Sequence, residues 1–240
     1  MKNIEQWKPN RIEWNGNRFV PSMRVIYPGS LHIADLQIRA YEPLIRKYIK
    51  GDLLDCACGS VPYYALYKGQ INSSTCIDWE ATHGTNPFLD HVVDLNEALP
   101  LADNSFDSIL LTDVFAHIAE PHQLMREFSR VLRPGGHLVL TSPFFYWISE
   151  PPHEYYRYTQ YALQRFCDTN NLEVCELSAY GGRIDVILDL LNKKMTGKLS
   201  NRIFLLFSNW YKKTSWYRKT SERTREKFPI GHCLVAKKKA

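Results

Sequence analysis

Residues 51–60 read GDLLDCACGS, and this stretch decides the fold. Its apolar half, 53–56, predicts a short buried strand, and the small residues of 57–60 predict a tight turn. Pro62 then suits the first turn of a short helix that runs to about Lys68. The chain thus passes from strand through turn to helix, which is the repeating unit of a parallel sheet.

The same alternation continues along most of the chain. Further strands are expected at 74–78, 91–94, 106–112, 137–141, 172–177 and 231–236, and further helices at 31–50, 121–132 and 159–170. Pro43 would split or kink the first of these helices, and Gly51 would stop it. The pattern predicts an α/β fold, a Rossmann-like, seven-stranded, mostly parallel sheet with helices on both faces. Ligands bind such sheets at the carboxyl ends of the strands.

Three of the expected strands end in a carboxylate, namely Asp55, Asp78 and Asp94. Ala57 and Gly59, which follow the first strand, are small enough to let a ligand approach the backbone N–H groups. The G-x-G-x-x-G fingerprint is absent, which disfavours a cofactor that carries a pyrophosphate. Each acid alone also fits a turn or a helix cap, but acids at successive strand ends favour a ligand site.

These acids and their neighbours suit a nucleoside. Asp78 can accept two hydrogen bonds from vicinal ribose hydroxyls, and Asp94 can meet the exocyclic amine of a purine. Trp79 and Leu95 each follow one of the acids directly and can hold the ring between apolar faces. The strand ends therefore predict a nucleoside-bearing cofactor.

Four segments carry a family resemblance: LLDCACGS, CIDWE, VVDLNEALPLADNSFDSILLTDVFAHI and EFSRVLRPGGHLVLTSP. In order and spacing they resemble the motifs of class I S-adenosylmethionine-dependent methyltransferases, over roughly residues 51–182. The resemblance implies S-adenosylmethionine as cofactor and a role for seven residues: Asp55, Ala57 and Gly59 around the methionine part, Asp78 at the ribose, Asp94 and Leu95 at the adenine, and Thr112 beside the sulfonium. At position 57 the family usually has glycine, so Ala57 is a departure.

Two loops offer a base for the reaction. Methyl transfer from a sulfonium is an in-line displacement that depends on positioning, and an oxygen acceptor also needs a base near its proton. The loop after 106–112 offers Asp113 and His117, and the loop 151–159 offers His153. Both loops are expected to open onto the same crevice. His117 could instead anchor the following helix, whereas the surroundings of His153 favour a functional role.

The run HEYYRYT at 153–159 resembles a segment of methyltransferases from bacterial surface-polysaccharide pathways. This second resemblance implies a sugar hydroxyl as acceptor, with His153 as base. Tyr155, Tyr156 and Arg157 would line the acceptor site, because aromatic rings suit the apolar faces of a sugar and arginine suits a phosphate or carboxylate.

The composition excludes several classes of protein. The chain has 240 residues, of which 45% are hydrophobic, 23% charged and 13% aromatic, as in a soluble globular protein. No apolar run approaches the roughly 20 residues of a membrane span, and the polar start lacks the apolar core of a signal peptide. The six cysteines show no zinc-ligand spacing and read as reduced thiols, so we expect no metal and a cytoplasmic protein.

The net charge of +5 conceals a division, since residues 1–192 carry −7 and residues 193–228 carry +9. We expect a lead-in and helical cap over 1–50 and a methyltransferase domain over 51–240, with a basic, aromatic insertion at about 195–228. Within the insertion, 201–213 has the spacing of a basic amphipathic helix. Such a helix either caps the active site or lies on an anionic membrane, which would place the protein peripherally at the inner membrane face.

Two other functions stay open. One is a non-catalytic scaffold that keeps the cofactor fold, although the intact Asp78 and Asp94 argue against it. The other is a nucleic-acid methyltransferase, which the basic segment suggests. Enzymes that methylate base amines usually carry [ND]-P-P-[YFW] after the fourth strand, whereas residues 112–115 here read TDVF, so nucleic acid is not favoured. The acceptor and the oligomeric state do not follow from the sequence.

Overall fold

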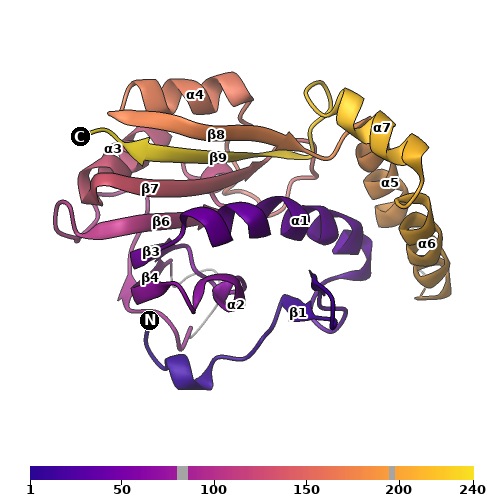
Figure 1. Ribbon diagram of the computed structural model, residues 1–240, viewed down its shortest axis with the longest axis horizontal. Coiled ribbons are helices and arrows are strands. Elements are labelled where there is room, and N and C mark those ends of the chain that lie inside the picture. Colours follow the sequence, from indigo (N-terminus) through magenta and orange to yellow (C-terminus); the bar gives the residue numbers. More distant parts are fainter. Residues whose placement is uncertain (80–85, 195–197) are drawn as a thin grey trace.

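A computed structural model describes residues 1–79, 86–194 and 198–240 of the chain. Its centre is a seven-stranded sheet in the order β5-β4-β3-β6-β7-β9-β8 (Figure 1). The strands are β3 (Gly51–Cys56), β4 (Ile71–Asp78), β5 (His91–Val92), β6 (Phe106–Thr112), β7 (Leu132–Pro143), β8 (Leu172–Tyr180) and β9 (Gly231–Lys238). The pairs among β5, β4, β3, β6 and β7 are parallel, and β9 is antiparallel to both β7 and β8. The predicted seven-stranded, mostly parallel sheet is confirmed.

Successive side chains of the central strands enter two different cores. In β6, for example, Ile109 and Leu111 belong to one apolar cluster and Leu110 to the other, because neighbouring residues of a strand point to opposite faces. Helices cover both faces (Figure 1): α1 (Leu31–Tyr48) and α2 (Tyr64–Tyr67) on one, α3 (Pro121–Val131) and α4 (Gln160–Asp168) on the other.

The order of the strands reverses between β3 and β6. From β3 the chain moves outward through β4 to β5 and then returns to the other side of β3 as β6. The loops after β3 and β6 therefore diverge at the carboxyl edge of the sheet, and such a switch point leaves a crevice for a ligand. This topology brings the loop after Cys56 next to the loop after Thr112.

The segment before the sheet contains η1 (Ile4–Gln6), the hairpin of β1 (Ile12–Trp14) with β2 (Phe19–Pro21), and η2 (Pro28–Ser30), followed by α1. The expected split at Pro43 does not occur, since α1 runs through this residue as one helix. Gly51 does not cap α1 but begins β3 with a φ of +67°, and a Cβ there would clash with the Asp107 carboxylate. The helix tolerates Pro43 because α1 packs on the sheet along its length.

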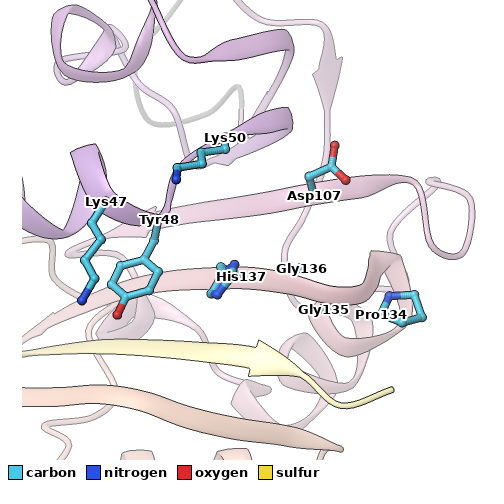
Figure 2. Close-up of a pocket in the computed structure, with 8 residues that line it drawn as sticks. All are labelled: Lys47, Tyr48, Lys50, Asp107, Pro134, Gly135, Gly136 and His137. Carbon is cyan, nitrogen blue, oxygen red and sulfur yellow. The ribbon is translucent and has the colours of Figure 1, made fainter.

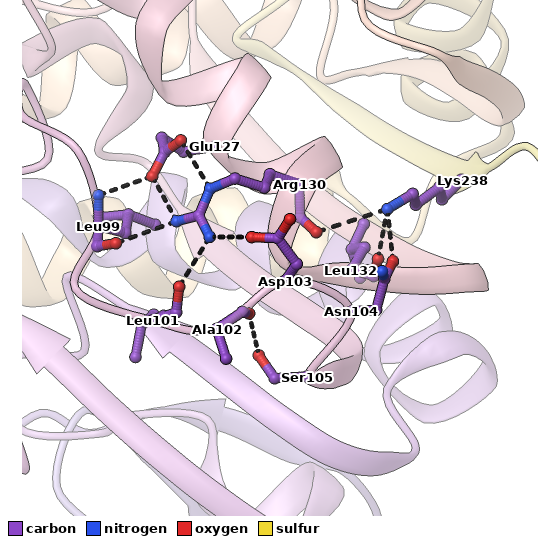
Figure 3. Close-up of polar contacts among 10 residues, drawn as sticks. All are labelled: Leu99, Leu101, Ala102, Asp103, Asn104, Ser105, Glu127, Arg130, Leu132 and Lys238. Carbon is purple, nitrogen blue, oxygen red and sulfur yellow. Dashed lines mark hydrogen bonds and ion pairs between the residues drawn. The ribbon is translucent and has the colours of Figure 1, made fainter.

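The loop between β5 and β6 is clamped onto α3 by one arginine (Figure 3). The Arg130 guanidinium donates hydrogen bonds to the backbone oxygens of Leu99 and Leu101, at 3.0 and 2.7 Å. It also bonds the carboxylates of Glu127 and Asp103. The clamp lies where this loop enters the amino end of β6, beside the start of β7, and so fixes the sheet edge opposite the carboxyl ends of the strands.

Three further helices connect β8 to β9: α5 (Arg183–Lys194), α6 (Lys198–Tyr211) and α7 (Ser215–Thr224). They lie together at one end of the sheet (Figure 1). The predicted insertion at 195–228 corresponds to α6 and α7, and its first residues, 195–197, lie outside the described residues. The helix over 183–194 was not among the expected elements.

Candidate active site at the carboxyl edge

The turn after β3 leaves open space beside its backbone. Gly59 has a φ of +50°, and a Cβ added there would meet no atom within 4 Å. Ala57 also has a φ of +50°, a left-handed conformation that glycine adopts without strain, which explains why glycine is usual at this position in the family it resembles. The open flank of Gly59 forms a cradle that a ligand can approach closely.

Asp78 holds this turn against the end of β4. Its Oδ2 accepts the backbone N–H of Gly59 and its Oδ1 that of Trp79, both at 2.7 Å. Each carboxylate oxygen keeps a second lone pair for another donor. The carboxylate thus stands directly beside the cradle, although the side chain itself is largely buried.

Asp55 lies beneath the turn. Its Oδ2 accepts a hydrogen bond of 2.6 Å from the Tyr67 hydroxyl. Burial, opposed by the Tyr67 hydrogen bond and assisted by the nearby charge of Asp78, raises the pKa of Asp55 to about 7. Near neutral pH this carboxyl group can therefore hold or release a proton.

The residues expected at the adenine differ in exposure. Asp94 is exposed, and its Oδ1 accepts hydrogen bonds from the backbone and side-chain amides of Asn96 at 2.9 and 2.8 Å. Leu95 is buried in the core between the sheet and α3, whereas Trp79 exposes 41% of its surface at the crevice. Asn96 was not singled out from the sequence, although an amide two residues after an aspartate is typical of such turns.

Thr112 and Asp113 follow β6 at the centre of the edge. Asp113 has a φ of +61°, and its carboxylate accepts hydrogen bonds from Tyr41 at 2.6 Å and from Gln37 at 3.0 Å. Thr141, at the end of β7, donates a third bond at 3.3 Å. Burial raises the pKa of Asp113, and the Tyr41 hydrogen bond opposes the rise. No local sequence pattern indicates Tyr41 and Gln37 as partners of Asp113, and only the fold brings α1 to this carboxylate.

The structure brings the two candidate histidines together, as expected of loops that share a crevice. The Nδ1 of His117 lies 2.9 Å from the backbone oxygen of His153. A carbonyl oxygen only accepts, so Nδ1 of His117 carries the proton, and the lone pair of the neutral ring is at Nε2. The Nδ1 of His153 lies 3.2 Å from the Tyr155 hydroxyl, and its ring meets Trp79 edge-on with centroids 5.4 Å apart.

The expected acceptor-site residues divide into two groups. Tyr155 and Tyr156 are exposed beside the histidines, and the N–H groups of both donate to the backbone oxygen of Ala116, at 2.9 and 3.2 Å. Arg157 instead contacts its own loop, where it donates to the backbone oxygen of Trp147 at 3.0 Å and forms an ion pair with Glu154. The tyrosines thus border the crevice, while the arginine braces its own loop.

A separate cavity of about 260 Å³ lies at the opposite edge of the sheet, near the amino ends of β3, β6 and β7 (Figure 2). It is lined by Lys47, Tyr48, Lys50, Asp107, Pro134, Gly135, Gly136 and His137. None of these residues is among those assigned to the cofactor or the reaction, and Lys47 is paired with Glu176 at 2.6 Å. Within 1–79, 86–194 and 198–240, no three histidine, cysteine or acidic side chains form a metal-binding group.

Comparison with known proteins agrees with this geometry. Residues 54–140 match a family model described as a methyltransferase domain. A demethylmenaquinone methyltransferase of Renibacterium salmoninarum is 32% identical over 96 residues, which are 39% of this chain and 38% of the relative. A ubiquinone/menaquinone biosynthesis C-methyltransferase, UbiE, of Hahella chejuensis is 42% identical over 65 residues, which are 24% of this chain and 26% of the relative. The similarity thus spans well under half of either relative.

Solved structures share the fold at low sequence identity. A methyltransferase from Mesorhizobium loti, which depends on S-adenosylmethionine, has a TM-score of 0.54 and 11% identity, with 86% of this chain and 100% of that chain covered. The [4+2]-cyclase SpnF has a TM-score of 0.55 and 19% identity, with 86% and 84% covered. The open turn at Gly59 and the adjacent Asp78 suit the cofactor of this fold. The strand order and the match of residues 54–140 to a methyltransferase domain are what a class I S-adenosylmethionine-dependent methyltransferase would show.

Proposed function

We propose that this chain is an S-adenosylmethionine-dependent enzyme that methylates a hydroxyl group of a small-molecule or glycan acceptor. The observation that supports it most is the position of His117 and His153 on loops that border the cofactor cradle. When bound, the cofactor supplies an electrophilic methyl group. The residues of the chain would hold it at Gly59, Asp78 and Asp94 and place the acceptor beside the histidines.

His153 is the proposed base. Its ring is exposed at the crevice, and Nδ1–H can donate to the Tyr155 hydroxyl, which leaves the lone pair at Nε2 for the proton of an acceptor. His117 holds the backbone of His153 through its own Nδ1–H. We therefore assign proton transfer to His153 and a positioning role to His117, and place the acceptor against Tyr155 and Tyr156.

Arg157 enters this proposal in a changed role. Its partners Glu154 and Trp147 lie within the loop after β7, so it would shape the acceptor site and would meet a phosphate or carboxylate only after leaving Glu154. The glycan acceptor rests on the resemblance of residues 153–159 to polysaccharide-pathway enzymes. The relatives named for quinone methylation make a ring carbon the competing acceptor.

The first experiment identifies the acceptor. The protein is incubated with cofactor labelled in its methyl group and with fractionated bacterial extract, and the labelled product is assigned to glycan, quinone, RNA or protein. Label in a glycan hydroxyl supports the proposal, and label on a quinone carbon contradicts it. Calorimetry with the cofactor tests the scaffold alternative. If the chain binds the cofactor but transfers label to no fraction, it does not methylate these acceptors, and the result supports a scaffold.

The second experiment tests the two histidines on the labelled fraction. His153→Asn should lower turnover about 100-fold, because an amide cannot take a proton, while the affinity for the cofactor stays within about twofold. His117→Asn is the matched control, since the amide nitrogen can replace Nδ1 as donor to the His153 carbonyl, and it should retain most turnover. Full turnover in His153→Asn would remove this residue from the mechanism.

A further inference from the structure

Helix α5 buries three polar side chains beside Leu188 and exposes three large apolar ones. Asp185, Asp189 and Asn192 are buried, whereas Leu190 is 64% and Leu191 48% exposed. A helix that packs on a protein core normally shows the reverse pattern. The outward apolar face thus calls for a covering that the described chain does not supply.

Buried hydrogen bonds hold α5 in this orientation. The Asp185 carboxylate accepts hydrogen bonds from Tyr217, through Oδ1, and from Ser221 at 2.6 Å, both on α7. Its Oδ1 also lies 3.3 Å from Nε2 of His32 on α1. Turning the helix over would leave this carboxylate without its donors, at a large cost in free energy. The exposed leucines are therefore a fixed feature of the fold.

Helix α6 adds a second apolar stripe. Ile203, Leu206, Phe207 and Trp210 follow the spacing of one helix face and are all at least half exposed. The same helix buries Phe204 against Leu188 and Tyr217 of its neighbours. We call the exposed large apolar residues of the three helices the apolar face; its members are Ile187, Leu190, Leu191, Ile203, Leu206, Phe207, Trp210 and Trp216.

Cationic side chains accompany the apolar face. Exposed lysines and arginines on or beside the three helices are Arg183, Lys194, Lys213, Arg218, Lys219, Arg223 and Lys227. Three of them line a hollow of about 730 Å³ around Trp216, namely Arg183, Lys219 and Arg223. Because residues 193–228 carry +9, two copies of this face would repel each other, whereas an anionic surface would be attracted.

The three helices stand at the catalytic edge of the sheet. They connect Tyr180, the last residue of β8, to Gly231, the first residue of β9. Gly231 pairs with Tyr180 and with Pro143, the last residue of β7, so the helices begin and end at the carboxyl end of β7. The Nζ of Lys193 lies 3.8 Å from the ring centroid of Tyr146 and 4.8 Å from that of Trp147, in the loop after β7. In Figure 1 the helices project beyond this end of the sheet.

We propose that α5, α6 and α7 form a docking surface for an anionic lipid bilayer, with the apolar face entering the headgroup region and the cations on anionic lipid headgroups. Apolar side chains with Trp on one face and lysines around them are the features of helices that lie in a membrane interface. No helix among the described residues is long and apolar enough to cross a membrane, so the surface lies on the bilayer. This inference does not depend on which acceptor is methylated.

Vesicle sedimentation tests the docking surface. The full chain should pellet with vesicles of phosphatidylcholine and phosphatidylglycerol and partition at least about fivefold less into phosphatidylcholine alone, because each lysine near an anionic surface contributes about that factor. Equal recovery with both vesicle types, or recovery with neither, overturns the proposal. Binding to an RNA oligomer without binding to anionic vesicles overturns it as well.

Variants separate the two components of the surface. Leu206→Ser combined with Trp210→Ser should lower partition at least about tenfold, whereas Tyr161→Ser, which removes a 76% exposed ring on α4, should not change it. Lys219→Glu should lower partition about fivefold or more, and Lys68→Glu, on the body, should change it much less. Cofactor calorimetry on each variant reports the fold independently.

Sedimentation velocity distinguishes a protein partner. If the chain forms a dimer that the Leu206 and Trp210 double variant converts to monomer, and anionic vesicles fail to bind, a second copy covers the apolar face and the proposal is wrong. A monomer that binds anionic vesicles supports it.

Discussion

The ionisation of Asp55 makes the stability of the fold depend on pH in a way that a single substitution can isolate. Burial next to Asp78 raises the pKa of Asp55 from 3.8 to about 7. Between these values the unfolded chain has released the proton that the native chain still holds. Unfolding therefore releases a proton in this range, and the free energy of unfolding falls as pH rises through it. Above about pH 7 both states are ionised and the fall ends.

The size of the effect follows from the pKa change. Each pKa unit corresponds to about 1.4 kcal/mol, so the change at Asp55 corresponds to about 4 kcal/mol between pH 4 and pH 8. Asp55→Asn removes the ionisation and keeps an oxygen that can accept the Tyr67 hydroxyl. The difference in unfolding free energy, wild type minus variant, should therefore fall by about 4 kcal/mol over this range.

Urea unfolding followed by circular dichroism at several pH values between 4 and 8 measures this difference. Asp168→Asn, an exposed aspartate on α4, is the control and should run parallel to the wild type. Wild type and Asp55→Asn curves that run parallel across the whole range would refute the reasoning, because they would show that Asp55 has the same pKa in both states.

Two further substitutions test the cradle and the clamp. Gly59→Val should weaken cofactor binding at least about tenfold in calorimetry and cost about 1–3 kcal/mol of stability, because valine is strained at positive φ and fills the open flank of the turn. The control is Gly69→Val, since Gly69 lies in open space without a positive φ. Equal cofactor affinities of the two variants would contradict the cradle. Arg130→Ala should lower the free energy of unfolding in urea by about 2–3 kcal/mol, because it leaves the carbonyls of the β5–β6 loop unpaired. The control Arg126→Ala, at an exposed arginine, should lower it by well under 1 kcal/mol. Similar losses in both variants would contradict the clamp.

Local sequence patterns were sufficient to predict the sheet. The alternation of apolar residues and the turn at 57–60 predict strands that the structure contains, because burial on both faces makes each central strand an apolar run bounded by turn residues. The carboxyl-edge position of Asp55, Asp78 and Asp94 follows from the same strands. Contacts with S-adenosylmethionine at these residues stay predictions.

The partners of Asp113 could not be found in this way. Tyr41 and Gln37 stand more than 70 residues earlier in the chain and lie on a helix whose packing position no local pattern specifies. A carboxylate at a strand end reads as a catalytic base until its donors are known. With its oxygens accepting from Tyr41, Gln37 and Thr141, Asp113 ties α1 to the sheet, which leaves the histidines as the more accessible bases.

Which charges of residues 193–228 reach the surface could not be predicted from the sequence either. Two of the lysines that give residues 193–228 their +9 are nearly buried: Lys193 pairs with Asp189, and Lys212 lies 3.2 Å from Asp35 on α1. These cations attach the helices to the body and cannot attract a partner. The remaining cations are mostly exposed, and they surround apolar side chains that would be costly to leave in water. Cations and exposed apolar side chains therefore occur together on these helices, and this combination favours the proposed docking surface over a merely solvated basic helix.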